Sequence, residues 1–225
     1  MKKLVFAIVT LVLATSCFSV HMNGSGIKCK GPIVEKSLEL KDFTGIVVNG
    51  TGDIDLTQSD TFSVVVTANE EVFDYIDYRI EDGVLILGTK DNKMLRAEKY
   101  EIAISLPVLE LITVNGAADV NMKGAYASDK DLTVQVNGAG DLNFNGIKVP
   151  SLYFGGNGAS DIKASGLDVQ SLTVSVNGAG DAVLSGKAVT AHFSVNGAGD
   201  IDASELECET YTTHKAGIAS IKVKK

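Results

Sequence analysis

The chain has 225 residues, 45% of them hydrophobic, with 23 glycines, 3 prolines and no tryptophan. The formal net charge is −8, from 28 acidic and 20 basic residues. This excess of acid argues against a nucleic-acid partner, since phosphate binding needs clustered Lys and Arg. The hydrophobic content excludes global disorder, and the length suits one large all-β domain or two small ones.

The N-terminus predicts an export signal that ends at a cysteine. A short basic start precedes an apolar run, residues 4–14, which matches the core of a signal peptide and is too short to span a bilayer. Small residues then lead to Cys17, in a pattern that resembles a bacterial lipobox. We expect residues 1–16 to be a lipoprotein signal peptide, Cys17 to carry lipid, and residues 17–32 to be a tether. The alternative is ordinary secretion with an incidental cysteine.

An exported lipoprotein of this kind contacts the membrane through its lipid anchor alone. We expect it in the outer membrane, facing either the cell surface or the periplasm. Two further cysteines, Cys29 and Cys208, could form a disulfide in an oxidising compartment. Two free thiols are the other reading, because an end-to-end stack would keep these residues far apart.

Residues 33–107 predict an irregular β part, with several apolar or alternating runs of strand length. Asn69-Glu70-Glu71 resembles the cap of a short helix or turn around residues 70–76. Glu81-Asp82-Gly83 lies between two strand-like runs and predicts a hairpin.

A repeated motif organises the second half of the chain, residues 108–225. The motif Val-Asn-Gly-Ala-Gly-Asp occupies residues 136–141, 176–181 and 195–200, with looser copies at 114–119 and 156–161 and an early one at 48–53. From Asn115 onward, successive motif asparagines are 22, 20, 20 and 19 residues apart. A fixed period near 20 residues is typical of a repeat array.

Each repeat contains short strands separated by turns. Leu172, Val174 and Val176 face one way by the two-residue period of a strand, and Ala182 and Leu184 resume this inward face after the turn. The corresponding residues of the other repeats are Val120, Met122, Leu142, Phe144, Ile162, Ala164, Ile201 and Ala203. One coil cannot bury its apolar face alone, so the coils must stack.

These features predict an all-β fold. We expect a right-handed parallel β-helix with about 20 residues per coil and an irregular N-terminal part, in one continuous domain over residues 33–225. The alternative is an antiparallel β meander or sandwich, because Asn-Gly between apolar runs is also a hairpin signal. The solenoid is favoured because the motif occurs once per repeat and its turn is longer than a two-residue hairpin. Residues 216–221 keep the phase but lose the Asn and Asp, which indicates a terminal cap.

The recurring polar residues have structural and functional readings. The asparagines would form a structural ladder of amides along the turn, at Asn115, Asn137, Asn157, Asn177 and Asn196. The aspartates could bond turn N–H groups or form weak cation sites for Ca²⁺, at Asp119, Asp141, Asp161, Asp181 and Asp200. No metal site is expected with certainty, and no other cofactor is indicated.

Catalytic signals are weak. The chain has three histidines and none of the common zinc or serine-hydrolase motifs. A polysaccharide lyase or hydrolase is disfavoured because the two arginines, Arg79 and Arg96, lie outside the repeats. We therefore expect the protein not to be an enzyme.

The pattern Phe43-x-x-Ile46-x-Val48-x-Gly50-x-Gly52-Asp53-Ile54-x-Leu56-x-Gln58, followed by the iterated motif, resembles the family named putative auto-transporter adhesin, head GIN domain. The resemblance covers roughly residues 35–222. It implies a right-handed parallel β-helix with an irregular N-terminal part, and a role in adhesion. We expect a glycan or protein partner on the solenoid face; the alternative is a scaffold protein that self-associates as a homo-oligomer.

Overall fold

The structure is a computed structural model that describes residues 26–224. The predicted signal peptide and Cys17 lie outside the described residues. The described chain is mostly β-strand, and its two helical elements are 3-10 turns, η1 (Glu70–Asp74) and η2 (Lys90–Asn92). None of these described helices is long and apolar enough to cross a membrane. The prediction of an all-β protein is confirmed.

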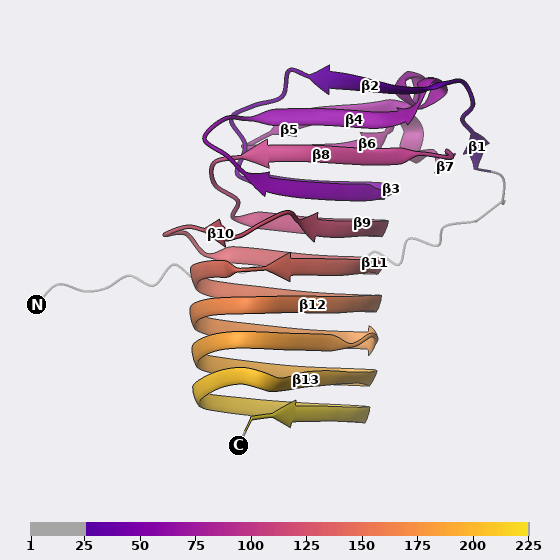
Figure 1. Cartoon of the computed structure of the whole chain (residues 1–225). Coiled ribbons are helices and arrows are strands. Elements are labelled where there is room, and N and C mark those ends of the chain that lie inside the picture. The colour runs from indigo at the N-terminus through magenta and orange to yellow at the C-terminus, as the bar shows by residue number, and fades with distance from the viewer. Residues whose placement is uncertain (1–25, 225) are drawn as a thin grey trace, which may run out of the picture.

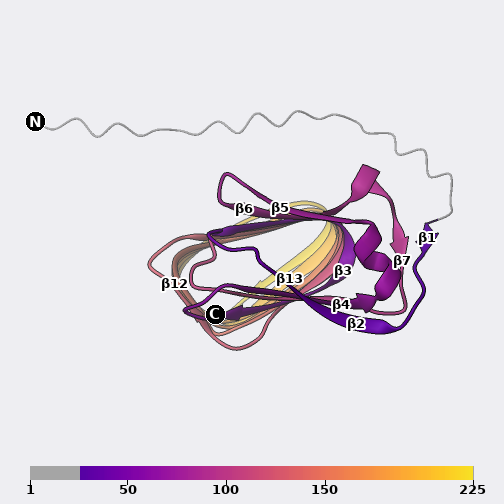
Figure 2. The ribbon, with the colours of Figure 1, turned by 90° about the horizontal axis from the view of Figure 1, so that it is seen from above.

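The strands stack from the N-terminal part to the C-terminal part of the chain (Figure 1). Viewed along the stack, they wind around a shared interior (Figure 2). In chain order they are β1 Ile27–Lys28, β2 Ile33–Leu38, β3 Gly45–Gln58, β4 Ser63–Asn69, β5 Ile76–Glu81, β6 Val84–Thr89, β7 Leu95–Arg96, β8 Tyr100–Leu106, β9 Leu111–Met122, β10 Tyr126–Ala127, β11 Leu132–Asn145, β12 Ile147–Ala179 and β13 Ala182–Val223.

The repeat region pairs in parallel. Along β11 and β12, Asn137 lies opposite Asn157, and the register continues residue by residue through the turn to the strand beyond it. β12 and β13 pair in the same sense, with one slip between Ala164 and Leu167. Antiparallel pairing at the Asn-Gly turns, which the meander alternative requires, does not occur in these coils.

The N-terminal part pairs differently, which makes the whole sheet mixed. β4 pairs antiparallel with β2 and with β8, and β5 and β6 form an antiparallel hairpin around Asp82-Gly83. The predicted hairpin is confirmed. The short turn after Asn69 is a 3-10 helix, but the side chain of Asn69 does not cap it. That part of the prediction is wrong, because Asn69 bonds to more distant backbone groups instead.

β3 joins the two parts of the sheet. On one side it pairs in parallel with β9, so that Asn49 lies over Asn115 although 66 positions separate them. On the other side its first four residues pair with β6 and its last six pair with β8. The early copy of the motif is therefore part of the same stack as the later copies.

The core runs through the whole stack. The inward residues expected from the repeat pattern, from Val120 to Ala203, are all buried. Phe144 and Phe154 meet edge to face, with ring centroids 5.4 Å apart. Tyr126 is also buried; its hydroxyl accepts a hydrogen bond from Leu109 N–H and donates one to Leu109 C=O, both at 2.8 Å. This pair of bonds satisfies a loop backbone that would otherwise be buried without partners.

The ends of the described chain differ. Ile27 and Lys28 pair with Leu95 and Arg96, so the structure places them in the folded body although they belong to the expected tether. In the last coil, Tyr211 is 49% exposed and Ile218 is 87% exposed. Cys29 is buried and Cys208 half-buried, and both are free thiols. Burial raises the pKa of each thiol, which favours the neutral form.

Candidate functional site

The motif asparagines form a continuous ladder on one edge of the stack. Asn115 Nδ2 donates to Asn49 Oδ1 at 3.0 Å, and the same bond links each of the next three motif asparagines to the one before it, at 2.9–3.0 Å. Asn196 lies opposite Asn177 in the same register. Each amide donates toward the N-terminal end, so the ladder has a direction.

The motif glycines explain why the turns can stack so closely. At Gly138 a Cβ atom would lie 2.0 Å from the carbonyl oxygen of Gly116, and its φ angle is +152°. The same contact, at 2.0–2.2 Å, recurs at Gly116, Gly158, Gly178, Gly197 and Gly217. Any side chain at these positions would therefore separate the coils.

The motif aspartates bond to backbone rather than to one another. Asp119 Oδ1 accepts from Asp141 N–H at 2.8 Å, and Asp181 Oδ1 accepts from Asp200 N–H at 2.9 Å. Asp161 and Asp200 accept equivalent bonds from the next coil. The described residues contain no cluster of three or more His, Cys, Asp or Glu side chains that could hold a metal ion.

The Ca²⁺ hypothesis is open to a direct test. Backbone amides occupy one carboxylate oxygen of each bonded aspartate, and a Ca²⁺ ion needs several oxygen ligands. We expect the melting temperature to be the same in 1 mM CaCl₂ and in EDTA. Because a ligand present at 100 times its Kd stabilises by about 2.7 kcal/mol, a rise of several degrees with CaCl₂ would instead support calcium binding.

One side of the stack is formed mainly by uncharged polar side chains, with Asp131 at its border. We call the neutral face the outward side chains of segments 132–136, 152–156, 171–176, 190–195 and 210–214, which lie in register. They are Thr133, Gln135, Tyr153, Ser171, Thr173, Ser175, Thr190, His192, Ser194, Thr210, Thr212 and His214. Hydroxyl groups dominate the set, and none of its members is Asp, Glu, Lys or Arg.

Charged residues of the same coils lie on the other sides. Lys148 pairs with Asp168 at 2.9 Å on the segment before the neutral face. Lys222 lies 4.0 Å from Asp202 on the segment after the Asp ladder. The absence of charge from the neutral face is therefore a property of that side and not of the repeats as a whole.

A shallow groove of about 200 Å³ crosses the neutral face between its last coils. It is lined by Thr173, His192 and Tyr211 among other residues. His192 Nδ1 lies 2.7 Å from Thr212 Oγ1, so the imidazole is held against the next coil. The groove combines hydroxyls with two aromatic rings in a place open to solvent.

A larger cavity of about 390 Å³ lies at the N-terminal end of the Asn ladder. Its floor includes Asn49, Gly50 and Thr51, and its walls include Met94 and Tyr100. The walls come from the excursion between β6 and β8, which leaves the stack after Thr89 and returns at Tyr100.

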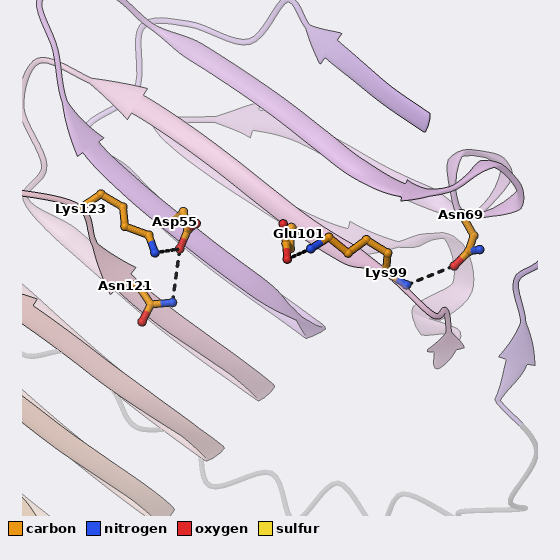
Figure 3. Close-up of polar contacts among 6 residues, drawn as sticks. All are labelled: Asp55, Asn69, Lys99, Glu101, Asn121 and Lys123. Atoms are coloured by element: carbon orange, nitrogen blue, oxygen red, sulfur yellow. Dashed lines mark hydrogen bonds and ion pairs between the residues drawn. The ribbon is translucent and has the colours of Figure 1, made fainter. Parts of the chain in front are cut away.

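Polar contacts of the buried Asn69 side chain and of its neighbours hold this excursion in place. Asn69 Oδ1 accepts from the backbone N–H of Glu98 at 2.8 Å. It also accepts from the backbone N–H of Lys99 at 3.2 Å, and the side chain of Lys99 pairs with Glu101 (Figure 3). Between the neighbouring strands β3 and β9, Asp55 Oδ1 accepts a hydrogen bond from Asn121 Nδ2 at 3.3 Å and forms an ion pair with Lys123 Nζ at 3.2 Å (Figure 3).

A pair of tyrosines closes the same region. The hydroxyls of Tyr78 and Tyr100 lie 2.5 Å apart. Burial, together with Tyr100, raises the pKa of Tyr78 well above its ordinary value, and burial also raises the pKa of Tyr100. Both rings are therefore neutral packing groups and not anionic ligands.

The sequence of residues 42–225 matches the family model described as "Putative auto-transporter adhesin, head GIN domain". The chain belongs to this family. No match was found among curated proteins. The fold of this head GIN domain is also found in solved structures of low sequence identity.

Three of these structures come from Bacteroides fragilis and Parabacteroides distasonis. A putative adhesin from Parabacteroides distasonis has a TM-score of 0.78 and 21% identity, over 88% of this chain and 85% of that one. A putative adhesin from Bacteroides fragilis has a TM-score of 0.70 and 20% identity, over 88% and 99%. A protein from P. distasonis described as a putative lipid binding protein has a TM-score of 0.70 and 19% identity, over 87% and 99%. At these identities the likeness concerns the fold.

Two surfaces of this head GIN domain were not anticipated from its sequence. The neutral face could have been found by listing the residues between the inward ones of each repeat, since the period places them in columns. The end cavity has no such signal, because it depends on how residues 89–99 leave the stack. The expected Asn and Asp columns lie on the turn edge, between the neutral face and the next strand segment.

Proposed function

We propose that this head GIN domain is an exported, non-catalytic adhesin that binds a neutral glycan through the neutral face. The observation that carries the proposal is the absence of charge from the neutral face over five successive coils, while the other sides of those coils carry Lys, Asp and Glu. The family name and the two structures described as putative adhesins support the same function.

The chemistry of the neutral face suits sugar hydroxyls. Successive coils repeat at about 4.8 Å, so Ser and Thr hydroxyls present donors and acceptors in a regular array. Tyr153 on this face and Tyr211 in the adjoining groove add apolar ring surface with a polar tip. A neutral polysaccharide could replace its hydrogen bonds to water by hydrogen bonds to these hydroxyls. A charged polymer would find no opposite charge on this face.

The architecture and the anchor complete the proposal. The register offset of about 20 residues supports a right-handed parallel β-helix as the scaffold, with the handedness taken from the strong bias of parallel crossovers. We propose that residues 1–16 are a lipoprotein signal peptide and that Cys17 carries the lipid. The domain would then lie on the outer side of the outer membrane. Protease treatment of intact cells is expected to remove the domain; protection until lysis would place it in the periplasm.

A charge placed on the neutral face should weaken glycan binding. We expect Ser194→Lys to reduce affinity for the best binder in a panel of neutral polysaccharides by about tenfold, which corresponds to about 1.4 kcal/mol. The matched control is Ser185→Lys, in the strand segment that follows the preceding motif and lies on another side of the stack. Affinity is measured by calorimetry with wild-type protein at 0.1 M and 0.5 M NaCl.

The salt series separates this mechanism from an electrostatic one. Binding to a neutral glycan should change little between the two salt concentrations, whereas binding to an anionic polymer should weaken as salt rises. Equal losses in the two lysine variants, or preference for an anionic polysaccharide such as polygalacturonate, would contradict the proposal.

Self-association is the second candidate function. It is favoured by the last coil, where Ile218 and Tyr211 are exposed. A scaffold of this type would show concentration-dependent oligomers in analytical ultracentrifugation and no binding to the polysaccharide panel. Ile218→Lys would then abolish the oligomers, because a buried lysine without a partner is costly.

A further inference from the structure

The end cavity lies where the described strands leave a gap beside the first motif turn. The turn at residues 49–52 pairs with residues 115–118 on one side. On the other side, pairing with β6 stops at Val48 and pairing with β8 begins at Asp53. No atom of the described residues lies within 4 Å of a Cβ built on Gly50, which lines the cavity. The irregular pairing of the N-terminal strands therefore creates a space that the regular coils do not have.

The interior of the end cavity is apolar. Val48, Leu87 and Ile102 line it, and all three belong to the buried core. Its volume of about 390 Å³ lies within the range of small-molecule sites, about 300–1,000 Å³. This size suits one small molecule with an apolar body and excludes a polymer chain. None of the neutral-face residues lines the cavity, so the two sites are separate and can be tested separately.

The rim of the end cavity carries a single charge. Among the described residues that line the cavity, Lys93 alone is charged, and it follows the rim of the cavity together with Met94; both side chains are partly exposed. Lys93 Nζ lies 3.3 Å from Asp91 Oδ2 and 5.7 Å from the ring centroid of Tyr75. Asp91 is mostly exposed, and ion pairs between exposed groups contribute little. The ammonium group of Lys93 is therefore available to a second carboxylate at the rim.

Hydrogen bonds fix the walls of the cavity around η2. Lys90 N–H donates to Tyr75 C=O at 2.8 Å, and Thr89 Oγ1 donates to Lys93 C=O at 2.7 Å. Another wall residue, Tyr100, is held through its hydroxyl by the tyrosine pair described above. The cavity is therefore formed before a ligand enters, which removes part of the entropic cost of binding.

We propose that the end cavity binds an aliphatic monocarboxylic acid of medium chain length. The aliphatic chain occupies the apolar interior beside Gly50, and the carboxylate lies at the rim next to the Lys93 ammonium group. Burial of the chain supplies most of the affinity, since apolar area is removed from water. The single cation at the rim sets the orientation of the ligand and selects a single negative charge.

Calorimetry of the full-length protein with sodium decanoate, kept below its micelle concentration, tests the proposal. We expect decanoate to bind and acetate, which has the same head group without the chain, to give no heat of binding. Lys93→Gln should weaken decanoate binding by about fivefold, the size of effect expected for one ion pair at a partly exposed site. The matched control is Lys163→Gln, which removes the same charge on another side of the stack and should leave binding unchanged.

Methionine methyl NMR locates the ligand independently of the lysine variants. Met94 lines the end cavity, whereas Met122 lines a separate groove on another side of the stack. In protein labelled with ¹³C at its methionine methyl groups, decanoate should shift the Met94 resonance and leave that of Met122 in place. Met94→Leu and Met122→Leu assign the two resonances. A Met94 resonance that does not move at saturating decanoate, or equal weakening by the two lysine variants, would overturn the proposal.

Discussion

Gly138→Ala is expected to lower the free energy of unfolding by about 2–6 kcal/mol. A non-glycine residue at a φ of +152° costs about 1–3 kcal/mol in backbone strain. Its Cβ would also lie 2.0 Å from the carbonyl oxygen of Gly116, and overpacking of this kind costs a further 1–3 kcal/mol, roughly. The coils would have to separate at the Asn ladder. Urea unfolding followed by circular dichroism measures the loss.

Gly124→Ala is the control for backbone strain alone. Gly124 also has a positive φ, +95°, but no atom lies within 4 Å of a Cβ built there. We expect it to cost about 1–3 kcal/mol and so to be the milder of the two. If both variants lost the same stability, the contact between coils would contribute nothing beyond the backbone angle.

Phe154→Ala is expected to cost about 3–5 kcal/mol, the usual range for truncation of a buried phenylalanine. Phe154 has no exposed surface and contacts Phe144 edge to face. The flanking inward residues belong to rigid paired strands, so the cavity cannot collapse easily. The midpoint of urea unfolding should fall while the slope stays constant.

Val183→Ala provides the surface comparison. Val183 is 52% exposed and points outward from a paired strand of the same stack. We expect a change within about 0.5 kcal/mol. A small effect of Phe154→Ala, close to that of Val183→Ala, would mean that the coils repack around the lost ring.

The repeat region could be predicted because its contacts recur. The period near 20 residues aligns Leu142 with Ile162 in the sequence, and the structure pairs these same residues. Alternation within each strand was then sufficient to identify the buried residues. Even the early copy at Asn49 was visible in the sequence, although its pairing with Asn115 was not.

The N-terminal part could not be predicted to the same depth. β8 pairs in parallel with β3 and antiparallel with β4, and no local pattern distinguishes these neighbours. Asn69 resembled a helix cap because its immediate neighbours are acidic, but its partners are Gly31, Glu98 and Lys99. Contacts over 29 to 38 residues without a repeat leave no periodic signal.

The coil-on-coil pairing has a mechanical consequence. Each coil is bonded only to its two neighbours, so a pulling force can detach one coil and leave the remainder intact. A detached coil of about 20 residues would release about 70 Å of chain. The domain would then lengthen in discrete steps under tension, and each detached coil would dissipate part of the load.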